Sequence, residues 1–436
     1  MAADEAGVPL SQWTKVRVQP AQRPDGSVVY VKADHVVAGL EPDPLPDAAT
    51  AVDADTEIGS SAPQSSPSDD LSADIVETAP APVPAAVPAM RFTHPGGVLV
   101  PSGAKARARA NLAALEVVTE CAAADRAATS DEQATLAAWS GWGAVPEIFD
   151  PARTDWAAER ERLQALLSES EYRTARASTL NAHYTDPAIA RAMWDALADA
   201  GFSGGRVLEP GCGSGNFVGL APESATMVGV ENDPLSAQIA HLLYPDAQIR
   251  NEGFEVTRVP EGSFTAAIGN VPFGDFSLRD PVHNPAGHNI HNHFLLKTLR
   301  LTAPGGYVVA LTSHYTLDAA DSRARRDLFE VGDLVGAVRL PSGAFRRVAG
   351  TDVVTDVLVL RRREEGRDRG DARWIGTDTV PLTTRDGVAA VDNDGEPVPA
   401  TINRYFLEHP QRVVGDMVAG RGLYGMELTV VHRDLA

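Results

Sequence analysis

The sequence predicts an α/β protein in which a helical lobe precedes a mostly parallel, doubly wound sheet. From Gly205 onward, short apolar strands alternate with helical segments, which is the pattern of βαβ units in a parallel sheet. The first of these strands, Arg206–Glu209, runs into three glycines at alternate positions. The last apolar strand, Val353–Arg361, follows its predecessor without a helix between them, so we expect it to be antiparallel.

Three segments are expected before this sheet. Residues 1–40 contain two β-like runs, Trp13–Gln19 and Ser27–Lys32, across an Asp-Gly turn, which indicates a small hairpin. Residues 41–95 form a linker rich in Pro, Ala and Ser, and the stretch 41–90 holds ten Asp and Glu and no Lys or Arg. Such a linker buries too little apolar surface to offset its ordering entropy and is expected to be disordered. Residues 96–180 form the helical lobe.

Periodicity and capping residues predict the helices of this lobe at Ala104–Ala127, Ser130–Trp139 and Trp156–Ala177. Ser130-Asp-Glu-Gln133 has the pattern of a capping box. A further helix opens at Pro187, with Thr185 or Asp186 as its N-cap.

The α/β domain is expected over residues 181–363, and residues 364–436 form a C-terminal extension. Its strands are predicted at Arg206–Glu209, Met227–Glu231, Gln248–Asn251, Ala266–Gly269, Tyr307–Thr312, Leu334–Arg339 and Val353–Arg361. Its helices are predicted at Leu235–Tyr244, Ile290–Thr302 and Ser322–Glu330.

The glycine loop after the first strand indicates a nucleotide site. Gly211, Gly213 and Gly215 allow positive φ and close approach of a ligand, although a purely structural turn is the alternative. The loop departs from the dinucleotide fingerprint, because Asn216 stands where that pattern requires its third glycine. Glu231 ends the next strand at a distance suited to accepting hydrogen bonds from ribose hydroxyls.

The fourth strand ends in Asn270-Val-Pro-Phe273, and this changes the interpretation of the loop. Together with the glycine loop, the tetrapeptide resembles the S-adenosylmethionine-dependent amino-methyltransferases, which carry Asn-Pro-Pro-Phe or Asn-Pro-Pro-Tyr. The resemblance implies their Rossmann-like fold and S-adenosyl-L-methionine as cofactor. It departs from the family at Val271, where proline is usual, and this puts the rigidity of the loop in doubt.

The resemblance also implies roles for individual residues. Asn270 and the Val271 carbonyl would each accept one N–H of an amino group and so localise its lone pair. Pro272 would stiffen the loop, and Phe273 would offer a face for a base to stack on. The implied cofactor-binding residues are Tyr184, Thr185, Glu209, Pro210, Gly211, Gly213, Gly215, Asn216, Phe217, Glu231, Asn232, Asn251 and Glu252.

The order of segments over roughly residues 100–436 resembles the N-terminal methylase part of very large methylase–helicase proteins of phages, plasmids and defence islands. The matching stretches are Lys105–Leu112, Trp139–Gly143, His183–Pro187, Leu208–Phe217, Gly269–Asp275, Ile290–Phe294, Arg339–Phe345 and Ala349–Asp356. This resemblance implies N6-adenine DNA methylation of a flipped base. It also implies a restriction-modification, phage-defence or mobile-element context, with a helicase in the same or a partner chain.

Other functions stay open at this point. The same fold could methylate RNA adenine, cytosine N4 or a protein glutamine, or it could serve as a non-catalytic DNA-docking or anti-restriction subunit. A nicotinamide oxidoreductase is disfavoured by the glycine spacing. No metal site is predicted, because His283, His288, His291 and His293 have no carboxylate or cysteine at ligand spacing.

Bulk properties set the remaining expectations. The formal net charge of −21 disfavours tight non-specific binding to nucleic acid. The two cysteines are far apart in sequence, which disfavours a disulfide framework. We find neither a signal-peptide pattern nor a long apolar run, and therefore expect a cytoplasmic protein that does not bind a membrane.

Overall fold

The computed structural model describes residues 18–22, 28–32, 89–179, 185–345, 353–392, 395–422 and 425–431. Two compact units are present, Met1–Ala85 and Ala86–Ala436. In the first, β1 (Val18–Gln22) pairs antiparallel with β2 (Val28–Lys32). β2 falls within the predicted run Ser27–Lys32, whereas β1 overlaps the predicted run Trp13–Gln19 only at Val18 and Gln19. The predicted Asp-Gly turn, and the linker as far as residue 88, lie outside the described residues.

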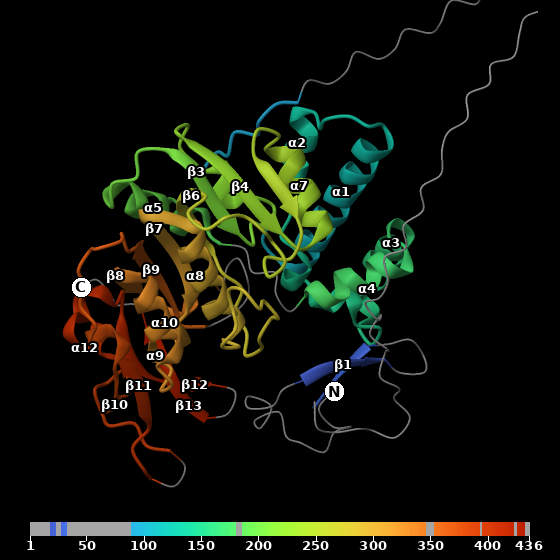
Figure 1. Cartoon of the computed structure of the whole chain (residues 1–436). Helices are drawn as coiled ribbons and strands as arrows, with labels where there is room; N and C mark the ends of the chain where they lie inside the picture. Colours follow the sequence, from blue (N-terminus) through green and yellow to red (C-terminus); the bar gives the residue numbers. More distant parts are fainter. Residues whose placement is uncertain are drawn as a thin grey trace, which may run out of the picture. The chain divides into compact units, whose positions relative to one another are not determined.

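A seven-stranded sheet forms the centre of the second unit (Figure 1), in the order β5-β4-β3-β6-β7-β9-β8. Its strands are β3 (Gly205–Pro210), β4 (Ala225–Glu231), β5 (Gln248–Asn251), β6 (Phe264–Asn270), β7 (Thr302–Ser313), β8 (Gly332–Arg339) and β9 (Thr355–Arg362). The first five are mutually parallel, whereas β9 is antiparallel to both of its neighbours. The predicted fold class is confirmed, and the antiparallel strand is inserted between β7 and β8.

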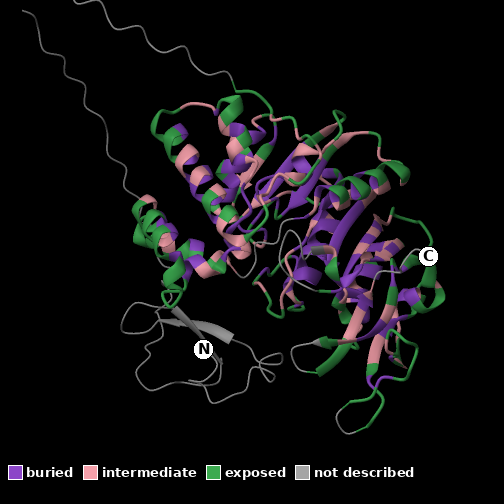
Figure 2. Ribbon diagram, turned by 180° about the vertical axis from the view of Figure 1, so that it is seen from behind, coloured by how far each residue is buried: buried purple, intermediate pink, exposed green. Residues whose placement is uncertain are grey.

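Alternating side chains divide the core into two layers, one on each face of the sheet. Val207 and Ile268 belong to one hydrophobic cluster, and the neighbouring Leu208 and Ala267 belong to the other. The first layer holds residues of α5 (Pro187–Asp199) and α7 (Pro234–Leu243), and the second holds residues of α8 (Ile290–Leu301) and α10 (Arg323–Val331). Figure 2 shows the buried residues concentrated along the strands between these helices.

The helical lobe consists of α1 (Ala104–Ala123), α2 (Ser130–Leu136), α3 (Ala157–Leu166) and α4 (Glu169–Ser178). Two predictions about it were wrong. The capping box of α2 is formed by Thr129 and Glu132, one residue before the predicted pair. The single helix predicted at Trp156–Ala177 is two helices, because Ser168 caps α4 with Glu171 and ends the helical path after Leu166.

The lobe shares its core with the sheet. Trp139 lies in the same hydrophobic cluster as Val207, and its Nε1 donates to Ser236 Oγ on α7 at 3.3 Å. Upstream, the backbone N–H of Phe92 donates to the Leu243 carbonyl at 2.7 Å. The segment before α1 is therefore attached directly to α7. Among the described helices, none combines the length and apolar character needed to cross a membrane.

The C-terminal extension contains β10 (Thr377–Pro381), β11 (Pro399–Asn403), α12 (Arg404–Glu408), β12 (Asp416–Gly422) and β13 (Gly425–Val431). It packs on the sheet through Arg339, which is fully buried and lies over the ring of Phe406 at 4.2 Å. Arg339 pairs with Asp318 and with Asp356, each at 2.8 Å.

Short helical segments lie at Asn216–Gly219 (α6) and Tyr315–Asp318 (α9), and 3-10 turns at Trp142–Ala144, Pro146–Phe149, Thr154–Trp156, Ser342–Phe345, Arg373–Ile375 and Pro410–Arg412.

Candidate active site

The glycine loop joins β3 to α6 at the carboxyl edge of the sheet, where ligands of parallel α/β folds bind. Gly211, Gly213 and Gly215 have φ angles of 76°, 55° and 90°, which side-chain-bearing residues rarely adopt. The Gly211 N–H donates to the Val230 carbonyl at 2.8 Å and so ties the loop to β4. A Cβ on Gly215 would lie 2.8 Å from Tyr244 Cε2, so packing as well as backbone conformation requires glycine there.

Glu231, the last residue of β4, lies beside this loop. Its two oxygens accept hydrogen bonds from the backbone N–H groups of Gly213 at 2.8 Å and Asp233 at 2.7 Å. Burial raises the pKa of Glu231 to about 7, although these two N–H groups favour the ionised form. The carboxylate is therefore fixed in direction and titrates close to neutral pH.

Glu209 lies deeper, at the end of β3. It is 2% exposed, and its Oε2 has no hydrogen-bond partner among the described residues. Burial, and then the charge of Glu231, raise the pKa of Glu209 well above its usual range. A cationic ligand beside these two acids would favour their ionised forms.

The residues after β5 are also bonded to Glu231. Asn251 Nδ2 donates to the Glu231 carbonyl at 2.9 Å, and the Glu252 N–H donates to the same oxygen at 3.0 Å. The Glu252 carboxylate pairs with Arg250 at 2.7 Å, while Asn232 and Asn251 are exposed. The structure thus brings the residues predicted at the ends of β4 and β5 together.

The tetrapeptide Asn270–Phe273 begins at the end of β6, which is next to β3 in the sheet. Among the described residues, a Cβ on Gly211 would meet Pro272 Cδ alone within 4 Å, at 4.0 Å, so the tetrapeptide faces the glycine loop. Val271 is 3% exposed, and its N–H donates to the Leu311 carbonyl at 3.0 Å. Proline has no N–H to donate, so the hydrogen bond from Val271 holds the loop in a way that the proline usual in the family could not.

Of the cofactor-binding residues predicted on either side of the glycine loop, some lie beside the loop, one is in the core and one lies outside the described residues. Asn216 Nδ2 donates to the Thr185 carbonyl at 3.2 Å, which joins the start of α6 to the start of α5. Asp186 is the N-cap of α5 and Pro187 its first residue. The ring of Phe217 is buried in the hydrophobic core. Tyr184 lies outside the described residues.

The four histidines after the tetrapeptide are all buried. His288 Nε2 contacts Asp327 at 2.7 Å, and His293 Nε2 contacts Asp280 at 3.2 Å. Over the residues that the structure describes, no group of three or more His, Cys, Asp or Glu side chains could hold a metal ion. Within the described residues, His288 and His293 therefore have carboxylate neighbours but form no group that could hold a metal ion.

Sequence reasoning missed two supporting features of the site. A Cβ on Gly229 would lie 2.7 Å from Cys212 Sγ, so glycine in β4 lets the thiol pack under the glycine loop. Lys297 is fully buried within α8 and pairs with Asp280. The available signal was a lone lysine inside the apolar run of that helix, and it would have indicated a buried ion pair.

The strand order decides the fold: five parallel strands, the glycine loop after β3, and an antiparallel strand inserted before the edge. The fold is that of a class I S-adenosylmethionine-dependent methyltransferase. S-adenosylmethionine is its expected cofactor, and the residues fit that group. The buried acid Glu209 and the half-buried Glu231 suit its cationic and hydroxyl groups, and the described residues leave space beside Gly211 for a ligand to approach the loop backbone.

Comparisons with known proteins agree with the methyltransferase fold. No protein-family model matches the chain. It is 30% identical over 189 residues to the "Defense against restriction protein B" of Escherichia phage P1, covering 42% of this chain and 8% of that protein. It is 31% identical over 223 residues to the type II methyltransferase M.XamI of Xanthomonas campestris pv. amaranthicola, covering 44% of this chain and 41% of that enzyme.

Among solved structures, a type I restriction-modification methyltransferase subunit of Streptococcus thermophilus aligns with 58% of this chain and 66% of its own, at 16% identity and a TM-score of 0.37. The chain spans less than half the length of either curated relative. The similarity to M.XamI agrees with the resemblance to restriction-modification methyltransferases that the motifs indicated.

Proposed function

We propose that the protein transfers a methyl group from S-adenosylmethionine to the N6 amino group of adenine in DNA. The observation that carries the proposal is the position of Asn270-Val-Pro-Phe273 at the end of β6, facing the glycine loop through Pro272 and Gly211. This arrangement would hold an amino nitrogen and a cofactor on the same edge of the sheet. M.XamI, named as a type II methyltransferase, supports it.

The Glu231 carboxylate is proposed to hold the ribose hydroxyls, and Asn232, Asn251 and Glu252 to border the adenine of the cofactor. Glu209, Thr185 and the glycine loop are proposed to enclose its amino-acid part. When bound, S-adenosylmethionine supplies an electrophilic methyl group, and the amino nitrogen that receives it loses one proton to water. The chain therefore has to position the acceptor rather than abstract a proton first.

The tetrapeptide is proposed to do this by hydrogen bonding. The N6 lone pair of adenine is delocalised into the ring, which makes the nitrogen a poor nucleophile. The side-chain oxygen of Asn270 and the backbone carbonyl of Val271 would each accept one N–H and favour a tetrahedral nitrogen. Phe273, half-buried beside them, would stack on the base.

A base must leave the duplex to reach this position. Tyr315 begins α9 directly after β7 and is 60% exposed, and the His314 ring lies 4.1 Å from its own. Because β7 is the neighbour of β6, Tyr315 is on the acceptor side of the site. We assign it as a stacking surface for a nucleobase in that region.

Partners and context belong to the same proposal. DNA is the proposed substrate, and a helicase domain or subunit acting with the chain is a proposed partner. The phage protein named for defence against restriction supports a restriction-modification, phage-defence or mobile-element context.

The deciding experiment is methyl transfer from labelled S-adenosylmethionine to unmethylated genomic DNA, with the product nucleosides identified by mass. Wild type is expected to make N6-methyladenine. Asn270→Ala is expected to lower the rate by about 10²–10³, as loss of one transition-state hydrogen bond does elsewhere, while keeping cofactor affinity. Product on cytosine, RNA or protein, or full activity in Asn270→Ala, would overturn the proposal.

A further inference from the structure

Lys297 is a fully buried lysine in a helix that faces the sheet. Its Nζ donates to the Phe254 carbonyl at 2.5 Å, to Asp280 Oδ2 at 2.8 Å and to the Glu255 carbonyl at 3.3 Å. An ammonium group has three N–H donors, so all of them are used within the protein. The ammonium also lies 4.9 Å from the centre of the Phe254 ring.

The two carbonyl acceptors belong to the turn 251–257, on the cofactor side of the site. This turn follows Asn251 and Glu252, which are bonded to the Glu231 carbonyl. Thr257 closes it by donating from its hydroxyl and its N–H to the Gly253 carbonyl, each at 3.1 Å. A shift of the turn would therefore move the two carbonyls that accept hydrogen bonds from Lys297.

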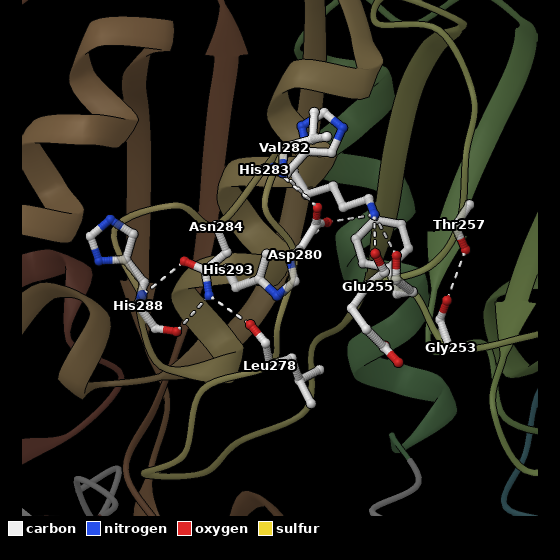
Figure 3. Close-up of polar contacts among 12 residues, drawn as sticks. Gly253, Glu255, Thr257, Leu278, Asp280, Val282, His283, Asn284, His288 and His293 are labelled. Carbon is white, nitrogen blue, oxygen red and sulfur yellow. Dashed lines mark hydrogen bonds and ion pairs between the residues drawn. The ribbon is translucent and has the colours of Figure 1, made fainter. Parts of the chain in front are cut away.

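The carboxylate acceptor belongs to the loop 274–289, on the acceptor side. Asp280 Oδ1 accepts from the N–H groups of Val282 at 3.2 Å and His283 at 3.1 Å, and its Oδ2 also contacts His293 (Figure 3). Burial raises the pKa of Asp280, but the bond and charge of Lys297, the His283 N–H and the His293 side chain outweigh it and lower the pKa. Asp280 is thus the charged centre around which the loop is folded.

The rest of the loop is hydrogen-bonded within itself and follows the tetrapeptide directly in the chain. Asn284 Nδ2 donates to the His288 carbonyl at 3.0 Å and to the Leu278 carbonyl at 3.2 Å, and the His288 N–H donates back to Asn284 Oδ1 at 2.8 Å (Figure 3). The loop begins directly after Phe273. Because these hydrogen bonds hold the loop together, the loop can move as one body when Asp280 moves.

We propose that Lys297 is a positioning residue that couples the cofactor-side turn 251–257 to the acceptor-side loop 274–289. Binding of the cofactor against Asn251 and Glu252 would hold the turn, and Lys297 would pass this restraint through Asp280 to the loop beside Asn270–Phe273. The inference rests on the proposed placement of the cofactor, and it is independent of which molecule accepts the methyl group.

The test is amide hydrogen exchange of the loop 274–289 with and without S-adenosylhomocysteine, the demethylated product form of the cofactor. In wild type, the ligand is expected to slow exchange in the loop by at least about fivefold, the low end of usual coupling factors. In the double variant Asp280→Asn/Lys297→Met, the new amide oxygen still accepts from the N–H groups of Val282 and His283, but the ammonium tether is gone. We expect its loop to exchange at the same rate with and without the ligand.

Thr298→Val is the matched control, because Thr298 is buried on the same helix and makes no bond to either segment that the structure shows. It should keep the wild-type response. If Lys297 were merely structural, the double variant would exchange faster by the same factor with and without the ligand. The ligand would then still slow exchange in the loop, and this would overturn the proposal. An unchanged wild-type loop on ligand binding would overturn it as well.

Calorimetric titration with S-adenosylhomocysteine distinguishes failure of the proposed Lys297 coupling from failure of the proposed function. No binding to wild type would overturn both proposals, whereas binding with no DNA product would overturn only the proposed function. If near-UV circular dichroism shows that the double variant is unfolded, Asp280→Asn alone gives the comparison. It replaces the ion pair by a neutral hydrogen bond and should lose part of the ligand effect; a full wild-type effect would contradict the coupling.

Discussion

The backbone N–H of Gly213 donates to Glu231 Oε2 at 2.8 Å, so the glycine loop after β3 and the acid at the end of β4 form one hydrogen-bonded unit. Each feature is common by itself. Joined, they place a carboxylate of raised pKa beside three glycines of positive φ. The proposed cofactor site can be tested through this unit.

Cofactor binding should depend on pH through Glu231. Its pKa of about 7 lies above the usual value, so the side chain is mostly protonated at pH 6 and mostly ionised at pH 8. Ribose hydroxyls donate to the ionised form, and affinity should therefore fall as the pH falls through this range. Calorimetry should find binding of S-adenosylhomocysteine about tenfold weaker at pH 6 than at pH 8. Glu231→Gln should bind weakly at both pH values; a tenfold pH effect remaining in that variant would assign it to another group.

Alanine at two glycines of the loop should have different effects. At Gly215, the positive φ costs about 1–2 kcal/mol and the overlap with Tyr244 costs about 1–3 kcal/mol more. At Gly211, a new Cβ would meet among the described residues only Pro272 Cδ, at 4.0 Å, so the backbone cost dominates; the Cβ would also occupy space proposed for the cofactor. Thermal unfolding should show the larger loss of stability for Gly215→Ala. Gly211→Ala should lose roughly tenfold or more in cofactor affinity, about 1.4 kcal/mol. Equal losses of stability with unchanged affinity in Gly211→Ala would contradict the assignment.

Restoring the family's proline should harm this protein. Val271→Pro removes the N–H that donates to Leu311 and most of the packing of a side chain that is 3% exposed. Together these should cost about 3 kcal/mol in the free energy of unfolding, measured in urea. Val271→Ile keeps the N–H and should cost less than about 1.5 kcal/mol. A proline variant as stable as wild type would show that the Leu311 bond contributes nothing.

Arg339→Met should be strongly destabilising, because it leaves Asp318 and Asp356 buried without their cation. The expected cost is about 3–5 kcal/mol. Arg323→Met, which breaks an exposed pair with Asp321, is the control and should cost less than about 1 kcal/mol. Adding Asp318→Asn and Asp356→Asn to Arg339→Met should recover part of the loss. Thermal unfolding of the variants makes the comparison.

Local sequence determined the strands and much of the predicted site, because each parallel strand is an apolar run that ends in a chemically distinctive residue. The predicted strand at Gln248–Asn251 agrees with β5 at both ends. The helix predicted at Trp156–Ala177 failed because periodicity hid a competing local signal, the Ser168-to-Glu171 capping pair. That signal was present in the sequence.

Lys297 could not have been placed in the same way. Its acceptors are 17 residues away at Asp280 and 43 residues away at Phe254, and only the packing of α8 on the sheet brings them together. The same holds for β9, whose neighbours are set by the topology of the whole sheet.

Because β9 lies between β7 and β8, strand β8 can join the sheet only after a later strand has been made. The strand that β8 pairs with in the sheet is β9, so residues 332–339 emerge from the ribosome before any sheet neighbour for them exists. Until residues 355–362 follow, the nascent chain carries an open edge on β7 and an unpaired β8, and exposed strand edges invite association with other chains. If elongation paused after residues 332–339 had left the ribosome but before residues 355–362 had, the nascent chain would expose these edges and would be prone to aggregate.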